Sequence, residues 1–117
     1  MAEALRRLEG AREVSETGRV DIAVGAAYYA MLYAARAALS EEGLYAKTHQ
    51  GTWTLFARTF VLPGRFDRDL ARRATAAQEV REDADYEAAP PTSEQAQGVL
   101  ADAEGFVAAV ERMLGSR

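Results

Sequence analysis

The stretch DIAVGAAYYAMLYAARAAL, residues 21–39, is the most continuously apolar part of the sequence and decides the fold. Between Ile22 and Leu39 the only charged residue is Arg36. A surface helix is normally polar on the side that faces water, so this pattern predicts a central helix that is covered on most sides. Helical spacing gives it a ridge of small side chains, Ala23, Ala27, Ala30, Ala34 and Ala38. The same spacing gives a bulkier face of Ile22, Tyr29, Leu32 and Tyr33.

The length and composition of the chain indicate one ordinary domain. The 117 residues are 49% hydrophobic and 27% charged, which is typical of a globular domain with a packed core. We therefore expect residues 1–117 to form a single domain.

The residue types that are absent exclude several kinds of site. There is no cysteine, so disulfides, Cys-ligated zinc and thiol catalysis are excluded. The longest charge-free run, Ile22 to Ala35, has 14 residues, which is shorter than the roughly 20 needed to cross a bilayer. The first residues lack the apolar core of a signal peptide. We expect a cytoplasmic protein with no membrane segment.

The charge balance limits the partners. A formal net charge of −4 argues against wholesale nucleic-acid binding and leaves only a local basic patch as a candidate. Nearly all the positive charge is arginine, and Lys47 is the only lysine. Arginine suits paired hydrogen bonds with carboxylate or phosphate groups.

Five helices are predicted from apolar periodicity and capping signals. The first spans Glu3 to Ser15 and the central one runs from about Arg19 to Glu41. Thr48 is a candidate N-cap for a short third helix that ends near Pro63. The fourth is expected from about residue 65 to 86, and the Thr-x-x-Gln spacing of residues 92–95 predicts a capping box that starts the fifth. No strand-like alternation occurs, so the fold class is all-α, an up-and-down bundle of four main helices plus a short one.

His49 is the only histidine, and it defines what hydrolytic or metal chemistry is open to the chain. No Gly-x-Ser-x-Gly turn accompanies it, which disfavours a nucleophilic hydrolase. No His-x-x-x-His or Glu-x-x-His pair occurs on a predicted helix, so we expect no metal site, and the chain has no phosphate-binding glycine loop. We expect no cofactor and favour a capping or structural hydrogen bond for His49.

Two other groups allow alternative interpretations. Arg65, Arg68 and Arg72 share one face of the fourth helix and could meet phosphates, but neighbouring carboxylates favour a solvated charged face. The central tyrosines, Tyr28, Tyr29 and Tyr33, could stack on bases. At helical spacing within an apolar run, core or subunit interface is the favoured interpretation.

The segment from Val80 to Tyr86 is the strongest candidate for chemistry. Arg81 and Asp85 are i and i+4 neighbours on a continuous helix and can form an ion pair. Arg81 also borders the apolar stripe of its helix, so its guanidinium could lie in a partly buried groove and bind an acidic group strongly.

Beyond these patterns, the chain resembles the HEPN domain family, small helical proteins often encoded beside a minimal nucleotidyltransferase. The resemblance spans nearly the whole chain and rests on Ala27-Tyr28-Tyr29-Ala30-Met31, Ala34-Ala35-Arg36-Ala37, Lys47-Thr48-His49-x-Gly51, Phe60-Val61 and Arg81 with Ala84-Asp85-Tyr86.

The resemblance implies a mechanism that this chain matches only in part. By this resemblance, catalytic HEPN proteins are metal-independent RNases, and they use an Arg-x4–6-His motif near a dimer interface. Here Arg81 matches the arginine, whereas Tyr86 stands where the histidine is expected. Tyrosine, with a reference pKa of about 10, is a poor general base near neutral pH. His49 could take over only if the third helix brought it beside Arg81.

These considerations give one expected function and two alternatives. We expect a nucleotide- or RNA-associated binding module, partner of a minimal nucleotidyltransferase in a toxin–antitoxin-like pair. The alternatives are a metal-independent RNase that uses Arg81 with Tyr86 or His49, and a non-catalytic scaffold.

The expected site residues follow from the same resemblance. The nucleotide- or RNA-binding residues are Arg81, Asp85, Tyr86, Lys47, His49 and Arg36. A homodimer is expected to bury Tyr28, Tyr29 and Tyr33 at its interface. Arg36 is expected to lie at the core edge with a carboxylate partner, or to line the dimer groove towards Arg81.

Overall fold

The computed structural model describes residues 1–86 and 90–115, with the side chains of residues 84–86 outside the description. The described chain is helical throughout its regular structure and contains no strand. The helices are α1 (Ala2–Ser15), α2 (Val20–Glu41), α3 (His49–Phe56), the π-helical segment η1 (Ala57–Val61), α4 (Arg68–Tyr86) and α5 (Ser93–Gly115). The prediction of an all-α fold with a short third helix is confirmed.

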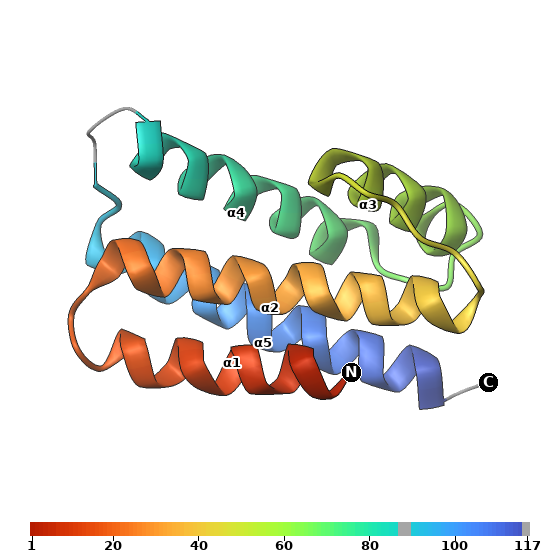
Figure 1. Cartoon of the computed structure of the whole chain (residues 1–117), viewed down its shortest axis with the longest axis horizontal. Coiled ribbons are helices and arrows are strands. Elements are labelled where there is room, and N and C mark those ends of the chain that lie inside the picture. Colours follow the sequence, from red (N-terminus) through yellow and green to blue (C-terminus); the bar gives the residue numbers. More distant parts are fainter. Residues whose placement is uncertain (87–89, 116–117) are drawn as a thin grey trace.

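The four long helices form an up-and-down bundle with α2 at its centre (Figure 1). α2 runs antiparallel to α1 and α4 and parallel to α5, and it contacts all three. The short α3 also packs on α2, on the same side as α4. The site described below therefore lies where α3 and α4 both face α2.

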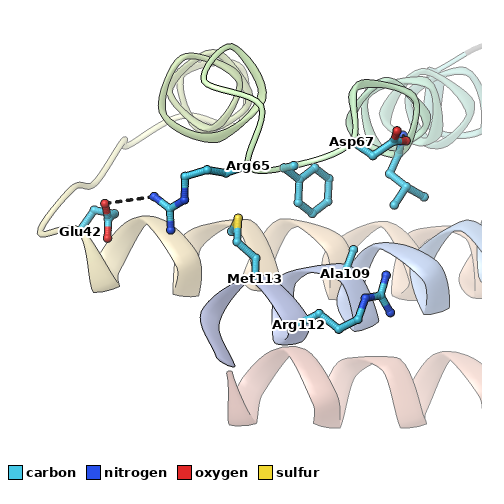
Figure 2. Close-up of a pocket in the computed structure, with 8 residues that line it drawn as sticks. Glu42, Arg65, Asp67, Ala109, Arg112 and Met113 are labelled. Atoms are coloured by element: carbon cyan, nitrogen blue, oxygen red, sulfur yellow. Dashed lines mark hydrogen bonds and ion pairs between the residues drawn. The ribbon is translucent and has the colours of Figure 1, made fainter. Parts of the chain in front are cut away.

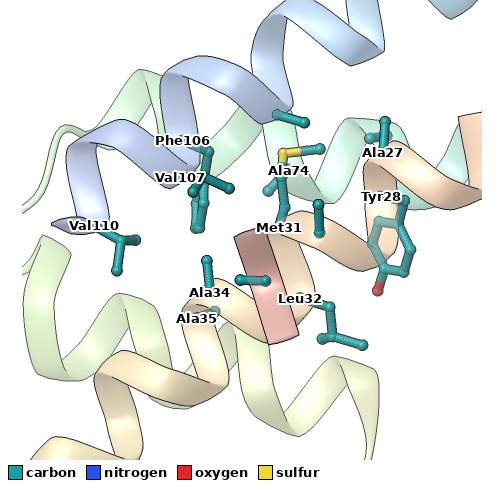
Figure 3. Packing of buried hydrophobic residues seen from close by; sticks show 14 of the residues in the cluster. Ala27, Tyr28, Met31, Leu32, Ala34, Ala35, Ala74, Phe106, Val107 and Val110 are labelled. Carbon is teal, nitrogen blue, oxygen red and sulfur yellow. The ribbon is translucent and has the colours of Figure 1, made fainter. Parts of the chain in front are cut away.

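The small-residue ridge of α2 is buried, as predicted. All five of its alanines are at most 3% exposed, and they pack among apolar side chains of α4 and α5 such as Ala74 and Phe106 (Figure 3). The bulkier face differs from the prediction at one end. Leu32 is buried and Tyr29 and Tyr33 are half-buried, but Ile22 is 46% exposed because it lies in the first turn of α2, at an end of the bundle.

α2 is long and apolar enough to cross a membrane by length and composition alone. Within its most apolar window, however, 61% of the residues are buried inside the bundle. Most of the residues that make α2 apolar enough for a membrane span are therefore part of the core of this bundle.

Two predicted caps are present. The Thr48 hydroxyl oxygen accepts a hydrogen bond from the Gly51 amide at 2.9 Å and so caps α3. Thr92 and Gln95 form the predicted capping box at the start of α5: the Gln95 amide donates to the Thr92 hydroxyl at 3.0 Å, and the Thr92 amide donates to the Gln95 side chain at 2.8 Å.

The predicted start of α4 near residue 65 is too early. The Asp67 carboxylate accepts a hydrogen bond from the Leu70 amide at 2.9 Å, which makes Asp67 the N-cap and places the first helical residue at Arg68. Arg65 and Phe66 instead belong to a turn that follows Gly64, whose positive φ of 84° suits glycine. Phe66 is nevertheless buried in the core.

The close packing of the alanine ridge can be tested with Ala34→Leu. Ala34 is completely buried, so added methyl groups have no free space and should destabilise the fold by about 1–3 kcal/mol in urea unfolding. The control is Ala76→Leu, at an exposed position of α4, where we expect a change within about 0.5 kcal/mol. Equal stability of the two variants would contradict close packing at the ridge.

Candidate functional site

The centre of the site is the Tyr28 hydroxyl, which lies inside the bundle and connects α2 to α3. Tyr28 is 0% exposed. Its hydroxyl oxygen accepts a hydrogen bond from the Trp53 indole nitrogen at 3.1 Å and lies 3.1 Å from Nδ1 of His49. His49 and Trp53 are i and i+4 neighbours on α3, so one face of that helix presents both to Tyr28.

Arg81 of α4 contacts the same tyrosines. Its guanidinium carbon is 5.2 Å from the ring centroid of Tyr28 and 5.5 Å from that of Tyr29. Both distances are within the range of cation–π attraction. The His49 ring centroid is 5.7 Å from each of these two rings. α3 thus brings the only histidine to the tyrosines that hold Arg81, the arrangement that the sequence alone could not show.

Arg36 adds a second half-buried cation two turns along α2 from Tyr29. Its terminal nitrogen donates a long hydrogen bond of 3.4 Å to the backbone carbonyl of Lys47, in the loop that leads into α3. Its Nε is buried and has no hydrogen-bond acceptor among the described residues. The expected carboxylate partner of Arg36 is absent from the described part of the chain, and a backbone carbonyl takes its place.

The surroundings of His49 favour its neutral form. Burial lowers the pKa of His49 below its ordinary 6.5, and the positive charges of Arg81 and Arg36 lower it further. The carboxylate of Glu82 partly offsets them. The buried Tyr28 is shifted in the opposite sense, because burial raises the pKa of its phenol and keeps the hydroxyl proton in place.

A polar groove of about 320 Å³ adjoins this cluster between α3 and α4. It shares Trp53 and Glu82 with the surroundings of His49. The Gln78 amide donates to the Glu82 carboxylate at 2.8 Å, which holds that acid on the groove wall. The lining residues are Gln50, Trp53, Thr75, Gln78, Glu79 and Glu82.

The predicted binding residues can now be placed. The structure brings Arg36, His49 and Arg81 together. Lys47 is exposed and contributes only its backbone carbonyl, which accepts a hydrogen bond from Arg36. Asp85 and Tyr86 have side chains outside the described residues. Trp53 and Glu82 were not predicted as site residues. The spacing of His49 and Trp53 on one helix face was the available signal for Trp53.

The three tyrosines expected at a dimer interface differ in exposure. Tyr28 is fully buried within one chain and has no surface left for a second copy, which corrects its assignment to an interface. Tyr29 and Tyr33 are half-buried. The Arg7 guanidinium of α1 lies 4.8 Å from the Tyr33 ring centroid and covers part of it.

A larger cavity lies elsewhere, between the turn before α4 and the C-terminal parts of α2 and α5 (Figure 2). Its volume is about 780 Å³ and it contains none of the predicted site residues. Arg65 pairs there with Glu42 at 3.5 Å. With Arg112 and Asp67, the lining carries two positive and two negative side chains. This balance makes it a poor anion site. No three His, Asp or Glu side chains in the described part of the chain are grouped to hold a metal ion.

The all-α bundle matches the expectation from the sequence, and comparison with known proteins gives the family. The chain belongs to the HEPN domain family, whose family model matches residues 1–113.

Three relatives extend over most of the chain. The protein named "Putative toxin MJ0605" from Methanocaldococcus jannaschii is 32% identical over 95% of this chain and 83% of its own length. The UPF0332 protein glr0978 of Gloeobacter violaceus is 32% identical over 92% and 86%, respectively. A UPF0332 protein of Thermotoga maritima is 31% identical over 92% and 82%.

The electrostatic coupling at the site can be measured on His49, whose ring resonances are the only histidine signals in the NMR spectrum. We expect a titration midpoint below 6.5. Arg81→Gln should raise the midpoint because it removes a nearby positive charge, and Glu82→Gln should lower it further because it removes the offsetting negative charge. Shifts in the same direction for both variants would contradict the arrangement.

The same shift has a consequence for stability. Because the pKa of His49 is lower in the folded chain than in the unfolded one, the unfolded state binds the proton more readily. The stabilising contribution of His49 to the free energy of unfolding is therefore complete above about pH 6.5, and it is lost as the pH falls through the pKa of His49 in the folded chain. His49→Gln should remove this part of the pH dependence of unfolding.

Proposed function

We propose that this chain is a toxin-like HEPN module that binds phosphate groups of RNA or of a nucleotide at the site formed by Arg36, His49 and Arg81. The observation that carries the proposal is that Arg81 and His49, from two different helices, contact the same pair of tyrosine rings. Arg36 adds the second cation that acts on the same imidazole.

The chemistry of these groups suits phosphate. Arginine offers several N–H donors in a planar arrangement and forms charge-assisted hydrogen bonds with phosphate oxygens. Arg36 also has a buried Nε with no acceptor among the described residues, a donor that a bound oxyanion or water can satisfy. Both cations lower the pKa of His49, so a bound anion would be stabilised by the same positive field.

The adjoining groove suits the remainder of a nucleotide. Glu79 and Glu82 repel phosphate, but their oxygens accept hydrogen bonds from base amino groups or ribose hydroxyls. Gln50 and Gln78 add amide donors and acceptors. A ligand with its phosphate at Arg36 and Arg81 and its base or sugar in this groove meets complementary groups at both ends.

The biological setting of the proposal rests on relatives and on the family resemblance. The name of the Methanocaldococcus relative supports a toxin-like role. The resemblance of the Tyr28-Tyr29, Lys47-Thr48-His49 and Arg81 motifs supports a minimal nucleotidyltransferase as partner and a homodimer as the working state. Tyr29 and Tyr33, which keep part of their surface exposed, are the candidates for contact between copies.

A metal-independent RNase is the second candidate, and it is supported by the contacts of Arg81 and the only histidine with the same two tyrosine rings. In this reaction a ribose 2′-oxygen attacks the adjacent phosphorus, and the bond to the 5′-oxygen breaks. Arg81 would stabilise the negative charge that develops on the phosphate oxygens, and His49 would transfer a proton to or from the reacting oxygens.

Binding is tested by fluorescence anisotropy with labelled single-stranded RNA at low salt. Arg81→Gln and Arg36→Ala should each weaken binding about tenfold or more, because a charge-assisted hydrogen bond contributes roughly 1.5–3 kcal/mol. Arg12→Ala, an arginine of α1 that pairs with Glu9 and Glu104, removes the same charge away from the site and should have little effect.

The same samples separate the candidate functions. Cleavage of the RNA in EDTA that Arg81→Gln abolishes would establish the RNase and refute a binding-only role. Equal weakening by all three variants would indicate a diffuse charge effect and contradict a localised site. If the wild-type chain bound neither RNA nor a nucleotide, only the non-catalytic scaffold would remain as a candidate function.

The partner is tested by purifying the tagged chain from its own cells. We expect a small nucleotidyltransferase to co-purify, and light scattering of the isolated chain to give about twice the 12.7 kDa of one copy. A monomer with no nucleotidyltransferase would contradict both parts of the proposal.

A further inference from the structure

The hydrogen bonds around the Tyr28 hydroxyl determine which nitrogen of His49 carries a proton. The indole N–H of Trp53 is only a donor, so the Tyr28 oxygen must be the acceptor in that 3.1 Å contact. The Tyr28 hydroxyl can still donate its own proton to a second partner. Tyr28 is 0% exposed, and Nδ1 of His49 at 3.1 Å is the acceptor that the described residues provide for this proton.

The opposite arrangement leaves a buried donor unsatisfied. If Nδ1 of His49 carried the proton and donated it to Tyr28, the phenol proton would have no acceptor among the described residues. Burial raises the pKa of Tyr28, so the phenol cannot relieve this by losing its proton near neutral pH. An unsatisfied buried donor is costly enough to bias the equilibrium about tenfold.

We propose that Tyr28 and Trp53 are positioning residues that hold neutral His49 with its proton on Nε2, which makes His49 a hydrogen-bond donor to a phosphate oxygen of the ligand rather than a proton acceptor. The chain of hydrogen bonds runs from Trp53 Nε1–H to the Tyr28 oxygen, and from the Tyr28 O–H to His49 Nδ1. The donor role of His49 deepens the proposed function and rests on it. The position of the proton on Nε2 is independent of that function.

The outward nitrogen is available for this role. The two nitrogens of an imidazole ring diverge, so when Nδ1 faces the buried phenol, Nε2 is directed away from it. Nε2 has no partner among the described residues and is not buried, which leaves it open to an incoming group. The charges that act on the ring are Arg36 from α2 and Arg81 and Glu82 from α4, and the two arginines favour an anion at that point.

The same geometry argues against His49 as the base that removes a ribose proton. Nδ1 already accepts the Tyr28 proton, and Nε2 already carries one, so neutral His49 has no free lone pair directed to solvent. A neutral donor at Nε2 can stabilise a phosphate oxygen through a hydrogen bond, but it cannot accept the 2′-hydroxyl proton.

The first test measures the proton directly in the free protein. Long-range proton–nitrogen NMR correlations distinguish a protonated ring nitrogen from an unprotonated one, and the single histidine removes any ambiguity of assignment. Well above the titration midpoint we expect Nε2–H in about tenfold excess. Tyr28→Phe, which keeps the ring and deletes the hydroxyl, should reduce this preference. An Nδ1–H form as the main species would overturn the inference without affecting the proposed function.

The second test addresses the donor role with labelled single-stranded RNA and inorganic phosphate as probes. His49→Gln retains an N–H donor near the Nε2 position and should bind RNA within about threefold of wild type, whereas His49→Phe should lose about tenfold. Phosphate should shift the Nε2 resonance of the wild-type protein. Equal binding by His49→Phe and wild type would overturn the donor role, and the independent loss caused by Arg81→Gln would still report on the proposed function.

Discussion

Most of this structure depends on one constraint, that α2 is apolar nearly all round and must be enclosed by the rest of the chain. Its alanine ridge lets neighbouring helices approach closely, and α1, α4 and α5 cover it on their respective sides. Tyr28 is the exception within this apolar surface, because its hydroxyl is polar and buried. Satisfying that hydroxyl requires donors and acceptors from another helix, and α3 supplies both with Trp53 and His49.

The candidate site is therefore a by-product of core packing. The tyrosines that fill space beside α2 also present their faces to Arg81, and the helix that satisfies Tyr28 brings His49 to the same place. Functional groups held by core residues have little freedom to move, which suits a site that must present donors in a fixed arrangement. It also means that substitutions at Tyr28 or Trp53 act on the site and on the fold together.

Local sequence signals predicted the parts of the fold that depend on neighbours in the chain. The burial of the alanine ridge, the Thr48 cap and the capping box of Thr92 and Gln95 follow from spacing along one helix. The start of α4 was placed too early because the apolar Phe66 is buried in the core, although the helix begins only after the Asp67 cap. Periodicity marks which residues face the core and does not by itself say where the backbone becomes helical.

The site itself was predictable only as a set of residues. Arg36, His49 and Arg81 could be named from the family resemblance, but their meeting depends on how α3 lies across α2, which no local spacing encodes. The same reason explains the error over Tyr28, since its depth becomes visible only when α3 is in place.

The contact between Trp53 and Tyr28 has an optical consequence. Trp53 is the only tryptophan in the chain, and its indole nitrogen is one hydrogen bond from the phenol that touches His49. Indole emission depends on the polarity and hydrogen bonding around the ring, so the tryptophan fluorescence of this protein originates beside its candidate site. The molecule thus carries a native reporter of events there, without any label.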